Sequence, residues 1–211
     1  MEIKKTTWNN QDRIDVNSTK PTSIILLHGR GGNAEDIINL SRHFFSKNNH
    51  YVAITAPSNQ WYPKPFTLAK SQNQPQLQHS LDLITSLIKE LRHASKNKIS
   101  IVGFSQGACL ALELSQINPQ YISTTVALSG GLIGENDEII QENKPNNTIS
   151  KPNIYISGSQ NDPFIPLERM TLSQKQLEKN NYNVTLNTYP GNTHTVTQTE
   201  INLLQELFLQ E

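Results

Sequence analysis

The chain lacks most of the features that would assign it to a specialised class of protein. Its 211 residues include a single cysteine, Cys109, so it cannot form an intrachain disulfide or a thiolate metal cluster. Lysine plus arginine and aspartate plus glutamate each number 18, which leaves no net charge and argues against nucleic acid as a partner. No apolar run approaches the roughly 18 to 20 residues that span a bilayer, which argues against stable membrane insertion.

A targeting segment is also missing from the expected places. The first residues, MEIKKTTWNNQD, contain no apolar segment of the kind found in signal peptides, so we expect a cytoplasmic protein. The apolar fraction of 35% is that of a globular chain, and 211 residues suffice for a domain with its own core. Since no internal repeat or linker is visible, we expect a single domain over residues 1–211. The oligomeric state, a homodimer included, stays open.

What the chain does contain is an alternation of apolar runs and amphipathic segments. The apolar, β-branched runs predict strands at 22–27, 51–55, 99–104, 124–128, 153–157 and 183–189. Helical spacing and helix-start signals predict helices from Asn33 to about 48 and at 77–95, 106–116, 166–180 and 198–209. This alternation indicates an α/β fold with a mostly parallel central sheet and helices on both faces. The segments 58–75 and 134–152 are expected to be loops.

Polar residues follow three of the expected strands. In a parallel sheet, functional groups gather at the carboxyl ends of the strands. Here those ends carry a serine in GFSQG, an aspartate in GSQNDP and a histidine in PGNTH. A serine hydroxyl is a weak nucleophile, so a histidine must accept its proton and a carboxylate must orient that histidine. The set Ser105, Asp162 and His194 therefore predicts nucleophilic catalysis.

The serine lies in a Gly-x-Ser-x-Gly pattern, within the stretch ISIVGFSQG. This pattern is typical of a tight turn between a strand and a helix that presents the serine hydroxyl. The alternative is a glycine-flanked turn around an unreactive serine, and the two later partners argue against it. The backbone N–H of Gln106, at the start of the helix, is one expected donor to the reacting oxygen. The loop HGRGG after the first strand offers the second donor, for which the Arg30 N–H is the best candidate.

For several other side chains, the sequence allows both a structural and a functional role. Trp61, Tyr62 and Phe66 lie in the loop NQWYPKPF, where they either pin the loop or form the walls of a substrate pocket. The Arg30 guanidinium is either remote from substrate or a recognition group for an anionic one. Cys109 comes one helical turn after Ser105 and is expected to be a small core residue rather than a second nucleophile.

The chain resembles the phospholipase/carboxylesterase branch of the α/β-hydrolases, which also includes acyl-protein thioesterases. The resemblance is carried by LLHGRGGNAEDI, WYPKPF, GFSQGACLAL, SGSQNDPFIP and YPGNTHTV, in the family's order from about Ile24 onward. It implies an α/β-hydrolase fold, the triad Ser105, Asp162 and His194, and catalysis without a cofactor or a metal. The chain departs from the family at Thr193, where glycine is common. The short region before the first strand implies that the usual antiparallel edge strands are reduced to one or two.

These observations predict a serine hydrolase that cleaves small-molecule esters or thioesters through an acyl-enzyme. The polar loops and the absence of an apolar lid in the sequence favour short acyl chains. An acyl-protein thioesterase or a lysophospholipase is the alternative among hydrolases. A dienelactone-hydrolase-like lactonase is disfavoured, because that group typically uses cysteine where this chain has Ser105. A non-catalytic binding protein of the same fold is the alternative outside enzymes, and the complete triad argues against it.

Overall fold

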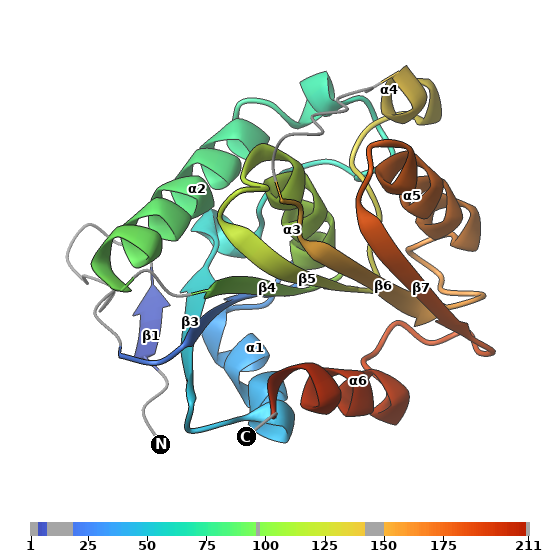
Figure 1. Ribbon diagram of the computed structural model, residues 1–211. Helices are drawn as coiled ribbons and strands as arrows, with labels where there is room; N and C mark the ends of the chain where they lie inside the picture. The colour runs from blue at the N-terminus through green and yellow to red at the C-terminus, as the bar shows by residue number, and fades with distance from the viewer. Residues whose placement is uncertain (1–3, 8–18, 96–97, 142–149, 210–211) are drawn as a thin grey trace.

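A seven-stranded sheet forms the centre of the molecule (Figure 1). The structure is a computed structural model that describes residues 4–7, 19–95, 98–141 and 150–209. The strand order is β1-β3-β2-β4-β5-β6-β7, and every neighbouring pair is parallel. The strands are β1 (Lys4–Thr7), β2 (Thr22–Leu27), β3 (Asn49–Thr55), β4 (Lys98–Phe104), β5 (Ile122–Leu128), β6 (Asn153–Ser159) and β7 (Asn183–Tyr189).

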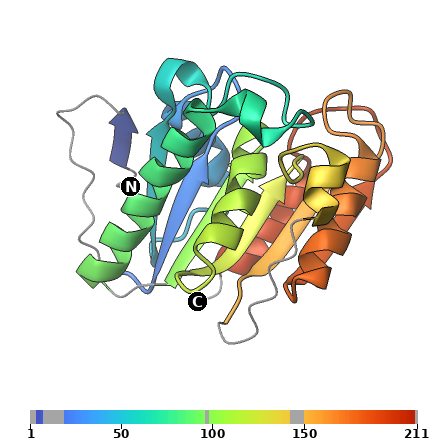
Figure 2. The same cartoon turned by 90° about the horizontal axis from the view of Figure 1, so that it is seen from above.

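Helices cover both faces of this sheet, which confirms the predicted α/β architecture. Helices α2, α3 and α5 lie next to one another on one face (Figure 2), and α1 and α6 lie on the other. No helix in the described ranges is long and apolar enough to cross a bilayer. The helices are α1 (Ala34–Ser41), α2 (Gln76–Ser95), α3 (Gln106–Ile117), α4 (Asn136–Gln141), α5 (Leu167–Lys179) and α6 (Gln198–Phe208), with 3-10 turns at Arg42–Phe44, Pro57–Asn59 and Lys70–Asn73.

The central strands are apolar on both sides because both sides are covered. In β2, Ile25 and Leu27 pack in the cluster formed with α2, α3 and α5. Ile24 and Leu26 of the same strand pack in the cluster formed with α1 and α6. Successive side chains of a strand point to opposite faces, so an uninterrupted apolar run is what a strand between two helical layers requires.

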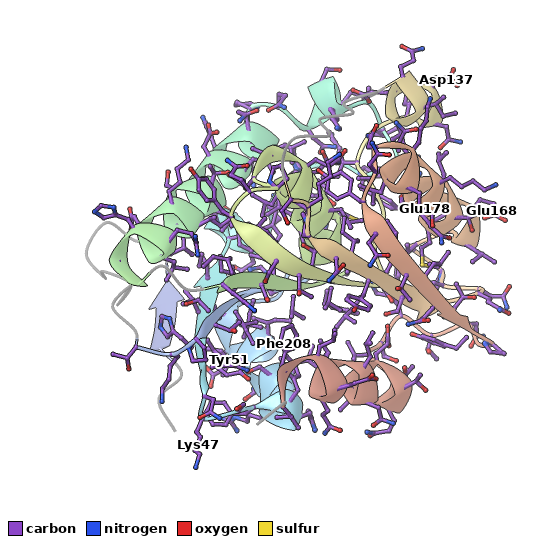
Figure 3. The ribbon with its side chains drawn as sticks, viewed as in Figure 1. Lys47, Tyr51, Asp137, Glu168, Glu178 and Phe208 are labelled. Atoms are coloured by element: carbon purple, nitrogen blue, oxygen red, sulfur yellow. The ribbon has the colours of Figure 1, made fainter. Side chains whose placement is uncertain are left out.

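The helices show the complementary pattern, with one apolar and one polar side. Glu168 and Glu178 point outward from α5 into solvent (Figure 3). Tyr51 of β3 and Phe208 of α6 are buried in the same apolar cluster, between the sheet and the helices on that face. This amphipathic arrangement is the reason the helix positions could be predicted from residue spacing.

The first helix begins as predicted but is shorter. The Asn33 side chain accepts hydrogen bonds from two N–H groups of the first turn, and the Asp36 carboxylate accepts one from the Asn33 N–H. The helix ends at Ser41 and continues as a short 3-10 turn, instead of reaching residue 48. Phe44 of this turn is buried, but the residues at 46–48 are polar, and β3 begins at Asn49, earlier than predicted.

The segment 134–152 is not only a loop, because α4 lies within it. Asp137 and Glu138 stand in the first turn of α4, where the helix dipole favours acidic residues, and Ile139 is buried. A helix of six residues is too short to show a clear apolar period, which explains the error. Residues 142–149 lie outside the described residues.

The N-terminal part of the sheet is reduced, as predicted. In the described part of the chain, β1 is the strand that precedes β2. It pairs with β3 at the edge of the sheet, and this pairing is parallel instead of the antiparallel pairing expected there.

Candidate active site

Three loops meet where the strands of the sheet end. Ser105 directly follows β4, Asp162 lies in the loop after β6, and His194 lies in the loop after β7. Because all the strands are parallel, their carboxyl ends share one edge of the sheet. The structure brings the three side chains into hydrogen-bonding contact at this edge.

The contacts form a continuous line from the carboxylate to the hydroxyl. Asp162 Oδ2 lies 2.8 Å from His194 Nδ1, and His194 Nε2 lies 2.8 Å from Ser105 Oγ. A carboxylate can only accept, so Nδ1 donates, and the neutral ring then accepts the serine hydrogen at Nε2. Asp162 Oδ1 accepts from the N–H groups of Phe164 and Ile165, at 2.8 and 3.0 Å. The carboxylate is therefore fixed, and it fixes the tautomer of the imidazole.

The two ends of this line differ in exposure. The Asp162 side chain is fully buried, whereas 16% of the His194 side chain is exposed. Phe104 and Phe164 flank the imidazole, each with its ring centroid 5.0 Å away. A reactant can thus reach the imidazole and the serine, while the carboxylate stays away from water.

Ser105 lies on a strained turn. Its backbone angles, φ 54° and ψ −117°, fall outside the regions that residues other than glycine favour. A Cβ at Gly103 would lie 2.3 Å from the Gly107 oxygen, and a Cβ at Gly107 would lie 2.3 Å from the Leu27 oxygen. Since both obstacles are backbone atoms of packed elements, the turn needs glycine on each side of Phe104-Ser105-Gln106.

Two backbone N–H groups are available next to the serine. Gln106 is the first residue of α3, and the first N–H groups of a helix have no partner within it. In the HGRGG loop, the Gly31 N–H donates to Asn59 and the Gly32 N–H donates to Gly29. No contact among the described residues occupies the Arg30 N–H, so both predicted donors remain unused by the fold.

The contacts of the Arg30 side chain argue against a role in binding an anionic substrate. Its guanidinium donates four hydrogen bonds into residues 60–64: one to the side-chain oxygen of Gln60 and three to backbone oxygens. These donors are therefore occupied by the loop. The structure favours the reading in which this guanidinium organises the loop.

The Gln106 side chain holds the same loop from the other side. Its Oε1 accepts from the Trp61 N–H at 2.9 Å, and its Nε2 donates to the Tyr62 oxygen at 2.7 Å. The side chain is buried, so these bonds satisfy two backbone groups that water cannot reach. Both residues with an unused N–H thus also anchor the loop that faces them.

A cavity of about 580 Å³ opens beside Ser105, and Tyr62 and Phe66 line it. Trp61 does not line it, so of the two roles left open for the aromatic residues, a pocket wall is not the one that Trp61 has. The Trp61 ring is fully buried, and its Nε1 donates to the His28 oxygen. Trp61 therefore anchors the loop because its donor finds a backbone partner in the core.

Two further buried groups have structural contacts. Burial raises the pKa of the Cys109 thiol to about 11, so the thiol stays protonated and is a poor nucleophile. Burial also lowers the pKa of His28. The His28 Nε2 accepts from the Ala56 N–H, and its Nδ1 donates to the Gly29 oxygen. Both ring nitrogens are thus used by the fold.

Glu200 was not singled out by the sequence pattern, although it supports the histidine loop. This buried carboxylate accepts at Oε2 from the Tyr189 hydroxyl and from both the N–H and the hydroxyl of Thr197. Its Oε1 accepts from the Ser157 hydroxyl at 2.6 Å. The Thr-x-x-Glu pattern signals a helix start, so it was a usable clue to the Thr197 contacts. The contacts with Tyr189 and Ser157 depend on the tertiary fold.

The chain matches the phospholipase/carboxylesterase family over residues 10–210. A phospholipase/carboxylesterase from Dyadobacter fermentans is 33% identical, with a TM-score of 0.81 and 94% of each chain covered. A carboxylesterase from Bacillus cereus is 18% identical, with a TM-score of 0.69 over 91% of this chain and 89% of that chain. The latter similarity concerns the fold.

A curated mouse protein is also similar to part of the chain. It is a carboxymethylenebutenolidase homolog, 30% identical over 139 residues, which is 65% of this chain. The chain spans about half, 51%, of the length of that relative. The similarity thus concerns one part of the mouse protein.

Proposed function

Because the chain belongs to the phospholipase/carboxylesterase family of hydrolases, we propose that it cleaves carboxylic esters through an acyl-enzyme formed on Ser105. The observation that carries the proposal is the line of hydrogen bonds from Ser105 through His194 to Asp162. It supplies a nucleophile, a base and an orienting acid, which are the three groups that acyl transfer by serine requires.

Acylation begins when Ser105 Oγ attacks the carbonyl carbon of the ester. His194 Nε2 takes the hydroxyl proton as the new C–O bond forms, and Asp162 stabilises the resulting imidazolium. The N–H groups of Arg30 and Gln106 donate to the oxyanion of the tetrahedral intermediate. His194 then gives the proton to the leaving oxygen or sulfur, and the bond from the carbonyl carbon to that atom breaks.

Deacylation repeats these steps with water. His194 removes a proton from a water molecule, whose oxygen attacks the carbonyl carbon of the acyl-serine. The oxyanion occupies the same two N–H groups, and the collapse of the intermediate returns the proton to Ser105. The carboxylic acid leaves, and no cofactor or metal takes part in this scheme.

The wall of the cavity supports short acyl chains as substrates. Residues 60–64 are held by Arg30 and Gln106, and Phe66 is held by the hydrogen bond that the Gly134 N–H donates to its oxygen. A wall fixed at several points has little freedom to open for a long chain. A thioester or a lysophospholipid remains the alternative substrate class, because the acyl chemistry is the same.

The central test is the Ser105→Ala variant. Hydrolysis of p-nitrophenyl butyrate should fall by about 10⁴-fold, as when a triad member is removed. Ser159→Ala is the matched control: its buried hydroxyl has no hydrogen-bond partner among the described residues, so activity should be retained. Near-normal hydrolysis by Ser105→Ala would contradict the proposed nucleophile.

Two further measurements address the alternatives. A fluorophosphonate probe should label Ser105 in the folded protein, and the absence of an adduct would favour a non-catalytic binding protein. A series of p-nitrophenyl esters from acetate to palmitate should show the highest kcat/KM at short chains. A maximum at long chains would favour a lysophospholipase or an acyl-protein thioesterase.

A further inference from the structure

A second cavity also borders His194. Its volume is about 450 Å³, and it shares Gly29, Arg30, Phe104 and His194 with the larger cavity described above. Its remaining lining comes mainly from α1 and from the residues after His194: His28, Gly32, Asp36, Ile37, Leu40, Thr195 and Val196. Ser105 lines the larger cavity and is not part of the lining of the smaller one.

The order of proton transfers distinguishes the two cavities. In the tetrahedral intermediate, the former carbonyl carbon bears the serine oxygen, the oxyanion, the acyl chain and the leaving group. The leaving atom must lie against His194 Nε2, because that atom gives it the proton as its bond to carbon breaks. The acyl chain must point elsewhere. The larger cavity continues from Ser105 past Gln106 to Cys109, one turn further along α3, which suits the acyl chain.

We propose that the smaller cavity binds the leaving group of the substrate, and that it selects an alcohol or thiol with an apolar body and no negative charge. This inference rests on the proposed function, since it assigns a second part of the same site. The acyl group then occupies the larger cavity, and the two halves of the ester are separated at His194.

The lining of the smaller cavity carries the apolar part of this proposal. Ile37 is buried on α1, and Leu40 of α1, Val196 and Phe104 are partly buried around the same apolar cluster. These side chains come from three segments that are far apart in the sequence, α1, the end of β4 and the loop after His194, and together they form one apolar surface beside His194. An alkyl or aryl group placed there would lose its contact with water.

The charges around the cavity support the second part of the proposal, that the leaving group has no negative charge. Asp36 contributes a carboxylate, of which Oδ2 accepts from the Asn33 N–H at 2.9 Å. Arg30 also lines the cavity, but the Nη1 and Nη2 donors of its guanidinium are committed to residues 60–64. His28 accepts from the Ala56 N–H at Nε2, and burial lowers its pKa, so the ring is neutral. A phosphate or carboxylate in this cavity would face the Asp36 carboxylate and would find these Arg30 donors already occupied.

The proposal has a kinetic consequence that an acyl site does not share. The leaving group departs with acylation, so contacts in the smaller cavity can affect acylation and cannot affect deacylation. A substitution in this cavity should change kcat/KM according to the leaving group. The rate of hydrolysis of a given acyl-serine should stay the same.

The first experiment removes an apolar contact with Leu40→Ala and compares methyl butyrate with benzyl butyrate. The benzyl-to-methyl ratio of kcat/KM should fall by about threefold to tenfold, the effect of losing one or two buried methylene-sized contacts. Deacylation, followed as the steady-state rate after the burst with p-nitrophenyl butyrate, should be unchanged. Ile165→Val, in the larger cavity, should keep this ratio and alter the butyrate-to-acetate ratio instead.

The second experiment tests charge with Asp36→Asn, which keeps an oxygen to accept from the Asn33 N–H. The substrates are butyrate esters of choline, of its uncharged isostere 3,3-dimethylbutanol, and of a sulfonate-bearing alcohol of similar length. In the wild type the sulfonate ester should be the poorest, by about fivefold or more against the neutral one, and Asp36→Asn should narrow this gap. Glu206→Gln, on the exposed side of α6, removes a charge away from both cavities and should leave the gap unchanged.

Three outcomes decide the matter. The proposal is overturned if Leu40→Ala changes all butyrate esters by one factor, or if the sulfonate ester is hydrolysed as fast as the neutral ester. A butyryl adduct on Ser105, detected by mass spectrometry, shows that the proposed function holds even when the leaving-group assignment fails. If no adduct forms and Leu40→Ala has no effect, both the function and this inference are overturned. Leu203→Ala, a partly buried leucine of α6 outside both cavities, controls for general destabilisation.

Discussion

The serine turn and the histidine loop hold the two side chains of one hydrogen bond, Ser105 and His194, and they do so by different means. Residues 103–107 are fixed by the backbone: the chain passes so close to its neighbours that a Cβ on either flanking glycine would lie 2.3 Å from a backbone oxygen. Residues 190–197 have an irregular backbone that is largely exposed. Beside a backbone hydrogen bond from the Asn161 N–H to the Gly191 oxygen, side chains hold this loop. Asp162 is bound to His194, and Glu200 is bound to Tyr189 and Thr197 at its two ends.

The difference shows that the two side chains of this site are held in position in two ways, one by backbone packing and the other by side-chain contacts. Ser105 is presented by a strained turn that local sequence encodes, and packing on both sides keeps the strain in place. His194 sits on a loop whose position depends on carboxylates from other elements. Substitutions in the turn should therefore act through folding, and substitutions around the loop should act through the alignment of His194.

The largest effect is expected in the turn itself. In Gly107→Ala the new Cβ would overlap the Leu27 oxygen, so β2 and α3 must separate. We expect a loss of about 3 kcal/mol in the free energy of unfolding, and at least a 100-fold loss of activity as Ser105 moves from its position. Urea unfolding and ester hydrolysis measure the two. A Gly107→Ala protein with normal stability would mean that the turn is not limited by packing.

An intermediate effect is expected at the far end of the histidine loop. Glu200→Gln replaces one carboxylate oxygen with an NH₂ group, which cannot accept from Tyr189 and Thr197. We expect kcat to fall about 10- to 100-fold through misalignment of His194, with KM nearly unchanged and a stability loss of about 1–3 kcal/mol. Glu206→Gln on the same helix is the control. An equal change in kcat and KM for Glu200→Gln would argue for a purely structural role.

A smaller effect, on the free energy of unfolding at high pH, distinguishes the serine turn from the histidine loop. The Cys109 thiol, under the serine turn, has a pKa raised to about 11 from 9.0 by burial. A raised pKa stabilises the fold fully below pH 9, and this contribution is lost as the pH rises through 11, at about 1.4 kcal/mol per pH unit. Urea unfolding between pH 8 and 11 should show this slope. In Cys109→Ala the slope should be shallower, and native Cys109 should resist a thiol reagent at pH 8.

The histidine loop is joined to a group that titrates at high pH, the Tyr189 hydroxyl. Burial and the Glu200 carboxylate raise the pKa of Tyr189 to about 12. The sign is the same as for the thiol: the contribution is complete below pH 10 and is lost as the pH rises through 12. Tyr189→Phe should therefore leave the slope between pH 9 and 10 in place, whereas Cys109→Ala should make it shallower.

The smallest effect is expected at Thr193, next to the histidine. The side chain is exposed, and the family commonly has glycine at this position. Thr193→Gly should change stability by less than about 0.5 kcal/mol and activity by about twofold or less. A large loss would show that the backbone of the loop, and not its side-chain contacts, sets the position of His194.

The contrast also explains which predictions from the sequence succeeded. The strand positions and the capping of α1 by Asn33 depend on residues close in the chain, so local patterns predicted them. The short helix α4 was missed because six residues carry too little periodicity. The role of Trp61 stayed open because its burial depends on the His28 oxygen and on Gln106 of α3, which lie far away in the sequence.

The sequence by itself determined the order of strands β2 to β7 and of the longer helices, the parallel sheet, and the placement of Ser105, Asp162 and His194 at its carboxyl edge. Parallel strands have one polarity, so residues that follow them must meet at that edge. Only the tertiary structure decided where the other side chains point. It turned the Arg30 guanidinium and the Gln106 amide into the loop at 60–64 and opened a second cavity beside His194. Those outcomes depend on partners from distant segments, which become neighbours only when the helices pack on the sheet.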